Sequence, residues 1–316
     1  MSETILHINH LVKFFNTSKG LVHAVDDVTL NIKRGSTLGV VGESGCGKST
    51  LGRAVLRLIE PTSGEVIFQD RSILKLNNEE MKSVRKEMQI IFQDPYSSLN
   101  PRMTVSAIIA EPLRVNRVCR SKSEMQERVS QMMQTVGLAE RLSNAYPHEL
   151  DGGRRQRIGI ARALALNPKF IVCDEPVSAL DVSIQAQILN LMMDIQQEKI
   201  LSYIFITHDL SVVKHISNDI AVMYLGKLAE KASSDELFEN PLHPYTKALL
   251  AAIPIPHVSS HKKKRQIIKG EVSSPINPKP GCRFAPRCGF VKPECHNMDP
   301  ELKEVSPGHH VACHLV

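Results

Sequence analysis

The strongest constraint on the fold is a nine-residue stretch near the N-terminus. Residues 42–50 read G-E-S-G-C-G-K-S-T and fit the phosphate-binding pattern G-x-x-x-x-G-K-[ST]. An apolar run at 37–41 predicts a buried strand before it, and residues 49–59 predict a helix after it. Glycines let successive backbone N–H groups turn toward one anion, and a helix start adds its positive dipole end. The stretch therefore predicts an α/β fold with a phosphate loop.

Two side chains of this loop have a defined chemistry in such a site. Lys48 is expected to reach the β- and γ-phosphates of a nucleotide, and the Ser49 hydroxyl to bind Mg²⁺. The residues that we expect to contact the nucleotide here are Gly42, Glu43, Ser44, Gly45, Cys46, Gly47, Lys48, Ser49 and Thr50.

Composition limits the other function classes. With 316 residues, 42% of them hydrophobic, the chain can bury a full α/β core and still carry an appendage. We find neither an apolar run of roughly 18 to 20 residues nor the basic-then-apolar order of a secretory signal, and expect the chain to stay in the cytoplasm. The net charge of +6 is partly local to residues 262–265, which we interpret as solvated charge in a linker.

The N-terminal segments predict an antiparallel β-region. Residues 5–15 and 25–32 alternate or run apolar ahead of the phosphate-loop strand. Phe14 and Phe15 stand there in a chain with only 4% aromatic residues. One of them could stack on an adenine ring, and both could equally be core residues; Phe15 is the stronger stacking candidate.

Two further predicted strands, at 64–68 and 88–92, lead to a glutamine and then to helices. Gln93 ends the second strand, and Pro95 follows two residues later. An amide in this place could contact Mg²⁺ or a metal-bound water, although a glutamine at a strand end is usually a surface residue. From residue 104 to about 149 the pattern is helical, which predicts a helical insertion in the α/β domain.

A carboxylate pair follows the apolar run at 170–173. In a parallel sheet this run is a central strand that presents Asp174 and Glu175 at its carboxyl end, beside the phosphate loop. Asp174 could hold Mg²⁺ and Glu175 could polarise the attacking water. The segment 178–181 comes next, ending in Asp181. A strand at 203–206 then leads to His208, which could contact the γ-phosphate or the water.

A second glycine pair precedes a helix expected at 158–165. Gly152 and Gly153 could again offer bare backbone N–H groups to an anion. Asp151, just before them, is also a good helix N-cap whichever function holds.

The fixed order of these motifs resembles the nucleotide-binding subunit of an ABC transporter across roughly residues 5 to 250. Within that family the chain is similar to the importers of oligopeptides, dipeptides and nickel. That closer resemblance rests on residues 93–102 (Q-D-P-Y-S-S-L-N-P-R), on residues 243–250 (H-P-Y-T-K-A-L-L) and on the cysteine-containing tail.

The resemblance implies a subunit that binds and hydrolyses ATP with Mg²⁺ and powers an importer, with di- or oligopeptides favoured as the cargo. Partners would be two membrane-spanning permease subunits, a second ATPase subunit and an extracellular substrate-binding protein, with no nucleic acid. The chain would lie peripherally on the cytoplasmic face of the membrane. Each ATP would lie between one subunit's phosphate loop and the Gly152–Gly153 stretch of the other.

One position departs from the family pattern. The family signature usually reads L-S-G-G-Q, whereas this chain has Asp151 for the serine and Arg154 for the glutamine. A carboxylate near a phosphate is repelled by several kcal/mol unless a cation intervenes, and Arg154 or Arg155 could be that cation. We therefore predict slow hydrolysis at the ATP site formed with this signature, and an asymmetric heterodimer.

The tail concentrates four of the seven cysteines. Cys282, Cys288, Cys295 and Cys313 have the spacing C-x5-C-x6-C-x17-C, looser than the paired C-x2-C units of a zinc ribbon. Four thiolates suit Zn²⁺ or an iron–sulfur cluster. The family resemblance favours [4Fe–4S] over zinc, and unliganded thiols are a third possibility.

Together these patterns predict an α/β fold: a phosphate-loop ABC ATPase core with an antiparallel β-subdomain and a helical insertion, plus a small C-terminal cysteine-containing tail domain. The predicted domains are residues 1–252, with the insertion at about 97–160, and residues 253–316, a linker with the tail. A nickel, metallophore or glutathione importer is the alternative function. A soluble ABC ATPase acting on nucleic acid or ribosomes fits less well, because such proteins usually carry two cassettes or a long coiled coil.

Overall fold

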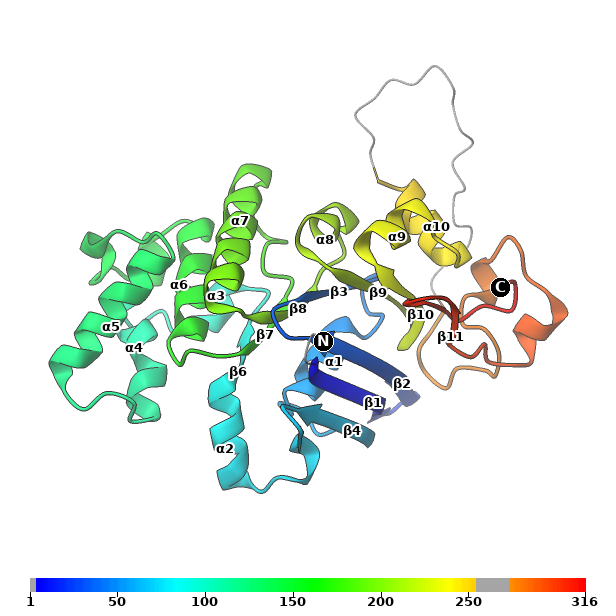
Figure 1. Ribbon diagram of the computed structural model, residues 1–316, viewed down its shortest axis with the longest axis horizontal. Helices are drawn as coiled ribbons and strands as arrows, with labels where there is room; N and C mark the ends of the chain where they lie inside the picture. Colours follow the sequence, from blue (N-terminus) through cyan, green and yellow to red (C-terminus); the bar gives the residue numbers. More distant parts are fainter. Residues whose placement is uncertain (1–3, 254–272) are drawn as a thin grey trace, which may run out of the picture. The chain divides into compact units, whose positions relative to one another are not determined.

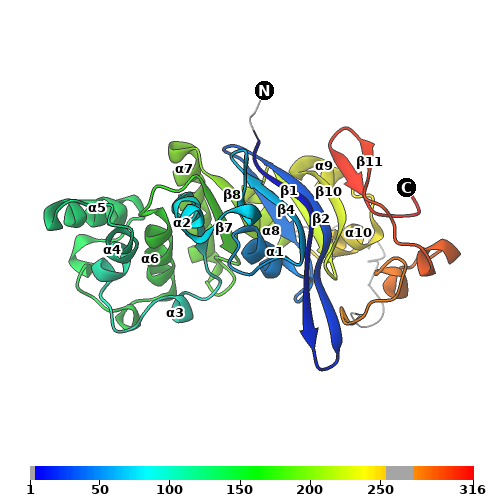
Figure 2. The same cartoon turned by 90° about the horizontal axis from the view of Figure 1, so that it is seen from below.

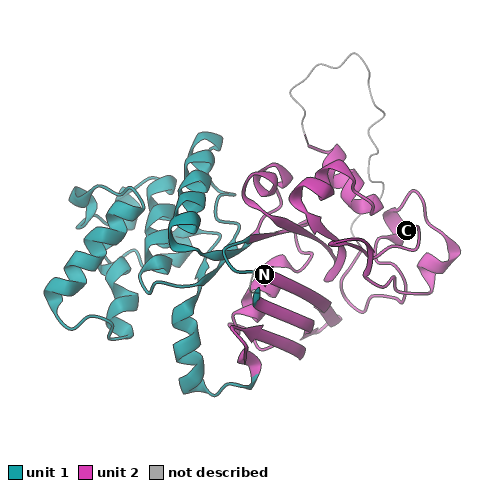
Figure 3. Ribbon diagram, viewed as in Figure 1, with its two compact units in different colours: residues 1–5, 33–36, 75–205 teal, residues 6–32, 37–74, 206–316 magenta. Residues whose placement is uncertain are grey.

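The structure is a computed structural model that describes residues 4–253 and 273–316. The chain divides into two compact units (Figure 3). Unit 1 holds mainly residues 75–205, and unit 2 holds residues 6–32, 37–74 and 206–316, so the described tail belongs to unit 2. The basic run at 262–265 and the first three residues lie outside the described chain.

The N-terminal part of unit 2 is a four-stranded antiparallel sheet, which confirms the predicted β-region. Strands β1 (Thr4–Thr17) and β2 (Gly20–Lys33) form a long hairpin, drawn in blue in Figure 2. The order is β2-β1-β4-β5, with β4 at Ser63–Phe68 and β5 at Arg71–Ser72. Leu6 pairs with Phe68 and Ile8 with Val66, so buried apolar residues of neighbouring strands share one face.

A second set of strands in unit 2 carries the phosphate loop. Strand β3 (Thr37–Val41) is buried at every residue and runs parallel to β9 (Asp219–Tyr224). Beyond β9 lie β10 (Lys227–Ser233) and two tail strands, β12 (His309–Val311) and β11 (Lys303–Ser306). The helices of unit 2 are α1 (Lys48–Val55), α8 (Leu210–Ile216), α9 (Ser234–Glu239) and α10 (Pro244–Ala251), labelled in Figure 1.

Unit 1 contains a parallel set of strands in the order β8-β7-β6. Their bounds are β6 Met88–Ile91, β7 Phe170–Asp174 and β8 Ser202–Ile206. Every residue of β7 and β8 is buried, which explains why both read as continuous apolar runs. The helices are α2 (Asn78–Glu87), α3 (Pro95–Ser98), α4 (Val105–Val115), α5 (Lys122–Thr135), α6 (Gly152–Leu164) and α7 (Val182–Lys199).

Capping explains where two helices begin. The predicted N-cap Asp151 is confirmed: it accepts a hydrogen bond from the Arg154 N–H, so helix α6 begins at Gly152, ahead of the helical run expected at 158–165. Helix α2 was not predicted, although Asn77 and Glu80 form a capping box at its start. The predicted helical insertion is present as α4, α5 and α6, which lie together in Figure 1.

A buried carboxylate joins the tail to the rest of unit 2. Glu230 of β10 is fully buried and accepts hydrogen bonds from the backbone N–H groups of Leu242 (2.7 Å) and His243 (3.0 Å). In the tail, the His309 ring lies 2.7 Å from the same carboxylate. Each oxygen of this buried anion therefore has partners, as a buried charge requires.

His243 caps helix α10 as a neutral imidazole. Its Nδ1 accepts a hydrogen bond from the Tyr245 N–H at 3.0 Å, which requires an unprotonated nitrogen. Burial lowers the pKa of His243 to about 4. The unfolded chain, with an ordinary pKa of about 6.5, therefore takes up this proton more readily than the folded chain, and stability falls as the pH drops from 6.5 toward 4.

We predict that His243→Asn weakens this acid sensitivity. Asparagine can still cap the helix but has no imidazole to protonate. The wild type should lose about 2 kcal/mol between pH 7 and pH 5 through this group, and the variant should not. Thermal unfolding at both pH values measures the difference. His148→Asn, at an exposed histidine, should keep the wild-type slope, and an unchanged slope in His243→Asn would contradict the assignment.

Candidate functional site

The phosphate loop joins β3 to α1 in unit 2, at the place the sequence predicts. Its glycines are required by close backbone contacts. Gly47 has φ 106°, and a Cβ on it would lie 1.9 Å from the Ala24 carbonyl oxygen. A Cβ on Gly42 would lie 2.2 Å from the Met223 carbonyl oxygen. No side chain fits at either position, so the loop can lie directly against two neighbouring strands.

Lys48 lies at the centre of the loop. The residue is 5% exposed, and its ammonium donates hydrogen bonds to the carbonyl oxygens of Gly42 (2.8 Å) and Glu43 (3.0 Å). The Cys46 sulfur lies 3.8 Å from the same ammonium, and burial raises the pKa of this thiol. The loop thus holds one buried cation within a ring of its own backbone.

Glu43 of the loop has partners from distant parts of the sequence. Its carboxylate accepts two hydrogen bonds from Arg287 of the tail, and its N–H donates to the hydroxyl of Tyr245 at 2.9 Å. Glu43 is predicted from the loop pattern, whereas the roles of Tyr245 and Arg287 emerge only from the structure. Tyr245 lies in the motif at 243–250, which is the feature of the sequence that could have drawn attention to this residue.

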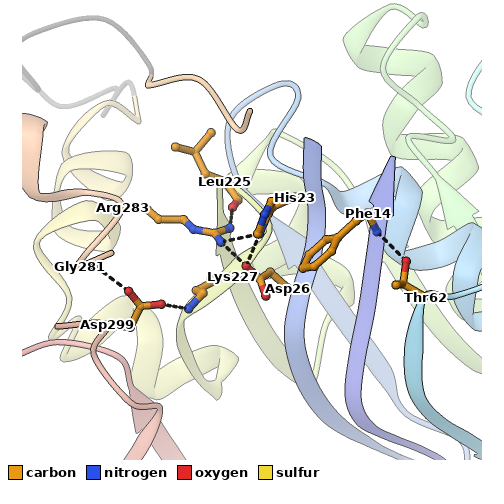
Figure 4. A network of polar contacts seen from close by, with 9 residues as sticks. All are labelled: Phe14, His23, Asp26, Thr62, Leu225, Lys227, Gly281, Arg283 and Asp299. Carbon is orange, nitrogen blue, oxygen red and sulfur yellow. Dashed lines mark hydrogen bonds and ion pairs between the residues drawn. The ribbon is translucent and has the colours of Figure 1, made fainter. Parts of the chain in front are cut away.

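The two phenylalanines of β1 have different surroundings. The Phe14 ring packs against His23, with ring centroids 4.0 Å apart (Figure 4). Phe15 is 37% exposed, with the Lys13 ammonium 4.8 Å from its ring centroid. An aromatic ring that stacks on a base needs an open face, and Phe15 meets this condition better than Phe14.

In unit 1, neighbouring strand ends bring together Gln93, a predicted Mg²⁺ contact, and Glu175, a predicted catalytic residue. Strands β6 and β7 are parallel, with Ile91 opposite Cys173, so Gln93 and Glu175 both follow the same edge. The Gln93 amide donates to the Glu175 carboxylate at 3.0 Å. Asp174 is 1% exposed. Glu175 has φ 47°, a left-handed conformation that costs energy for a residue with a Cβ and recurs at functional sites.

The helix start at Asp151 is held by its own side chains. Besides capping α6, the Asp151 carboxylate lies 3.4 Å from the Arg154 guanidinium. Arg155 is buried, and its guanidinium has other partners than Asp151. It donates a hydrogen bond to the Pro147 carbonyl oxygen at 2.7 Å, and its Cζ lies 3.6 Å from the centroid of the Tyr96 ring. Of the two predicted cations, Arg154 is therefore the one that pairs with Asp151.

The remaining predicted residues of the site follow nearby elements. Gly152 and Gly153 pack close to Leu180 and Ile184 of unit 1, since a Cβ on them would lie 3.1 Å and 2.7 Å from those side chains. Asp181 is exposed at the start of α7. In unit 2, the exposed His208 follows Thr207, whose N–H donates to the Val40 carbonyl oxygen of β3.

The tail cysteines do not support the predicted metal. All seven cysteines are free. Among residues 4–253 and 273–316, no three histidine, cysteine, aspartate or glutamate side chains are grouped so that they could hold a metal ion. The expected [4Fe–4S] or Zn²⁺ site at Cys282, Cys288, Cys295 and Cys313 therefore lacks support from the geometry of these residues.

Within residues 4–253 and 273–316, no helix has both the length and the apolar character that crossing a bilayer demands.

Comparisons with known proteins agree with the order of motifs. The family model described as ABC transporter matches residues 25–178, and the model described as oligopeptide/dipeptide transporter, C-terminal region, matches residues 229–295. The oligopeptide transport ATP-binding protein AppF of Bacillus subtilis is 52% identical over 99% of this chain and 98% of its own length. The corresponding protein OppF of Escherichia coli is 55% identical over 92% of this chain and 87% of its own length.

Solved structures share the fold. The dimeric ATP-binding cassette MJ0796, bound to ADP and Pi, is 30% identical with a TM-score of 0.66 and covers 72% of this chain and 98% of its own. The cbiO1 protein of Clostridium perfringens, part of an ABC transporter complex, is 28% identical with a TM-score of 0.67, over 75% of this chain and 92% of its own. The chain is therefore a member of the ABC transporter family, an ATP-binding and ATP-hydrolysing transport subunit that carries the C-terminal region of the oligopeptide/dipeptide group.

Proposed function

We propose that this chain powers a membrane importer of di- or oligopeptides. The observation that carries the proposal is that one chain joins a phosphate-loop cassette to the oligopeptide/dipeptide transporter C-terminal region at 229–295. Relatives similar over nearly the whole chain bear oligopeptide transport names. The subunit would bind peripherally to two permease subunits on the cytoplasmic face, beside a second ATPase subunit, and an extracellular binding protein would deliver the peptide.

The cargo is tested with the assembled complex in proteoliposomes. With the binding protein present, a short unlabelled peptide should raise ATP hydrolysis several-fold, while Ni²⁺, a metallophore or glutathione should not. The expectation follows because cargo delivery must favour the hydrolytic conformation for transport to be coupled to ATP. Stimulation by one of the other cargoes, without stimulation by peptide, would contradict the peptide assignment.

We assign the nucleotide contacts to the residues predicted from the sequence. Phe15 stacks on the adenine, residues 42–50 surround the phosphates, and Lys48 exchanges its loop carbonyls for phosphate oxygens. Ser49, Asp174 and Gln93 would hold Mg²⁺, which would supply positive charge beside the phosphates. Support comes from the buried ammonium of Lys48 at the loop centre and the exposed ring of Phe15.

Glu175 is the proposed general base, and His208 contacts the γ-phosphate. The hydrogen bond from Gln93 holds the Glu175 carboxylate in one orientation. A carboxylate with a fixed orientation is better placed to take a proton from water than one that rotates freely. Gln93 also belongs to the segment that continues into α3, so it is suited to report the state of the site to the helical insertion.

We predict that Glu175→Gln in the assembled complex lowers hydrolysis at this chain's loop by about 10²- to 10⁴-fold, because the amide cannot take the proton. ATP binding, measured with a fluorescent analogue, should persist. Lys48→Ala should lose binding itself, because the loop then lacks its cation. Glu198→Gln, at an exposed glutamate of α7, is the matched control. Full hydrolysis in Glu175→Gln would reject Glu175 as the base.

The proposal extends to an asymmetric heterodimer. The second ATP site would use this chain's helix start, where a serine is replaced by Asp151. The Asp151–Arg154 pair supports the proposal, because it leaves a carboxylate with partial neutralisation and no hydroxyl where phosphate would bind. Turnover at that site should therefore be slow, while the site at Lys48 and Glu175 carries most of the activity.

This asymmetry is tested in a Glu175→Gln background, where residual turnover comes from the site that uses Asp151. Adding Asp151→Ser should raise that turnover by about tenfold or more, because it removes a charge and supplies a hydroxyl while keeping an N-cap. Asp151→Asn keeps the cap and removes only the charge, so it separates the two effects. If Glu175→Gln and the equivalent change in the second ATPase subunit cost equal activity, the asymmetry is wrong.

A further inference from the structure

We propose that Arg287, from the C-terminal region, is a positioning residue for ATP binding: it holds and neutralises the carboxylate of Glu43 inside the phosphate loop. The inference rests on the proposed binding of ATP phosphates at residues 42–50. It gives the C-terminal region a direct part in nucleotide affinity.

The contact between the two residues is bidentate and largely shielded from water. One guanidinium nitrogen of Arg287 lies 2.7 Å from one Glu43 carboxylate oxygen, and the second nitrogen lies 3.0 Å from the other. The side chains are 8% and 26% exposed. Paired, charge-assisted hydrogen bonds of this kind fix orientation as well as charge. Glu43 thus has one defined side-chain position.

Glu43 is also anchored through its backbone, so the position of its side chain affects the loop. Its N–H donates to the Tyr245 hydroxyl, and its carbonyl oxygen accepts from the Lys48 ammonium. The tail therefore holds the carboxylate of Glu43, α10 holds its N–H, and Lys48 holds its carbonyl oxygen. A shift of Glu43 would change the position of the Lys48 ammonium.

Charge explains why the loop needs this arginine. An unpaired carboxylate in a loop that receives a polyanion would oppose binding, by an energy that is large at short range in a partly buried site. Arg287 cancels that charge. It also directs the carboxylate to a partner outside the loop.

Packing around Arg287 keeps the guanidinium in place. It ends the short 3-10 helix Ala285–Arg287, and Phe284 just before it packs edge-on against Tyr224, with centroids 5.3 Å apart. Phe284 lies 5.3 Å from the Tyr245 ring as well, so the aromatic cluster joins the residues on both sides of Glu43. Arg287 itself donates to the Tyr224 hydroxyl at 3.3 Å.

A second attachment of the tail lies close by in sequence. Arg283 pairs with Asp26 of β2 and donates to the Leu225 carbonyl oxygen (Figure 4). Lys227 pairs with Asp299, which also accepts from the Gly281 N–H. These side chains attach the tail to the rest of unit 2 but make no contact with the phosphate loop. Substitutions at them therefore show what loss of a tail contact does when Glu43 keeps its partner.

The test is a double-mutant cycle on the full chain, with affinity for a fluorescent ATP analogue and thermal stability as separate readouts. Arg287→Ala should weaken ATP binding by about tenfold or more, because Glu43 keeps its charge and loses its partner. Glu43→Gln measures the effect of removing the carboxylate charge from the loop itself. Adding Glu43→Gln to Arg287→Ala should restore most of the affinity that Arg287→Ala loses, because the unpaired charge is gone. Lys227→Met should lower stability but leave ATP affinity unchanged.

Other outcomes overturn the inference. Normal ATP affinity in Arg287→Ala would reject it, and so would an equal loss in Arg287→Ala and in the double variant, because that result describes a purely structural contact. Lys48→Ala separates this failure from failure of the proposed site. If Lys48→Ala binds ATP normally, the assignment of ATP to the loop is wrong, whereas a loss there together with normal affinity in Arg287→Ala rejects only the role of Arg287.

Discussion

The position of the phosphate loop depends on close contact between its backbone and the backbone of two neighbouring strands. Gly47 and Gly42 lie so near the carbonyl oxygens of Ala24 and Met223 that no other residue fits. The backbone of the loop therefore lies directly against the strands β2 and β9. This leaves Lys48 free to direct its ammonium inward, and it makes the position of the loop a property of unit 2 as a whole.

Strand ends could be predicted well from the sequence, because their signal is local. The apolar run at 37–41 became β3 with those bounds, and the run at 170–173 became β7, which extends by one residue to Asp174. The pairing of Gln93 with Glu175 follows from two parallel strands in register, which the sequence order suggests but does not fix. The sequence already favours Phe15 over Phe14 as the residue that stacks on adenine. The structure adds the reason: the β1–β2 hairpin places His23 against the Phe14 ring.

Contacts of the tail could not be predicted from the sequence. Arg287 and Glu43 are 244 residues apart, and an isolated arginine in a loop-rich segment carries no signal of its partner. The strands β11 and β12 are short, and their pairing with β10 depends on the position of the tail. Cysteine spacing likewise says nothing about where the sulfur atoms point, so a ligand set cannot be derived from it. The geometry of residues 4–253 and 273–316 gives the predicted cluster no support.

The attachment of β12 to β10 has a consequence for the integrity of the chain. Strand β12 covers the outer edge of β10, with Val311 opposite Glu230, and His309 supplies a partner for that buried carboxylate. A chain cut before the tail would expose a row of unpaired backbone groups on β10 and leave Glu230 without the imidazole. Such an edge can recruit strands from other molecules. Loss of the tail should therefore favour self-association of the chain through β10 over a smaller working cassette.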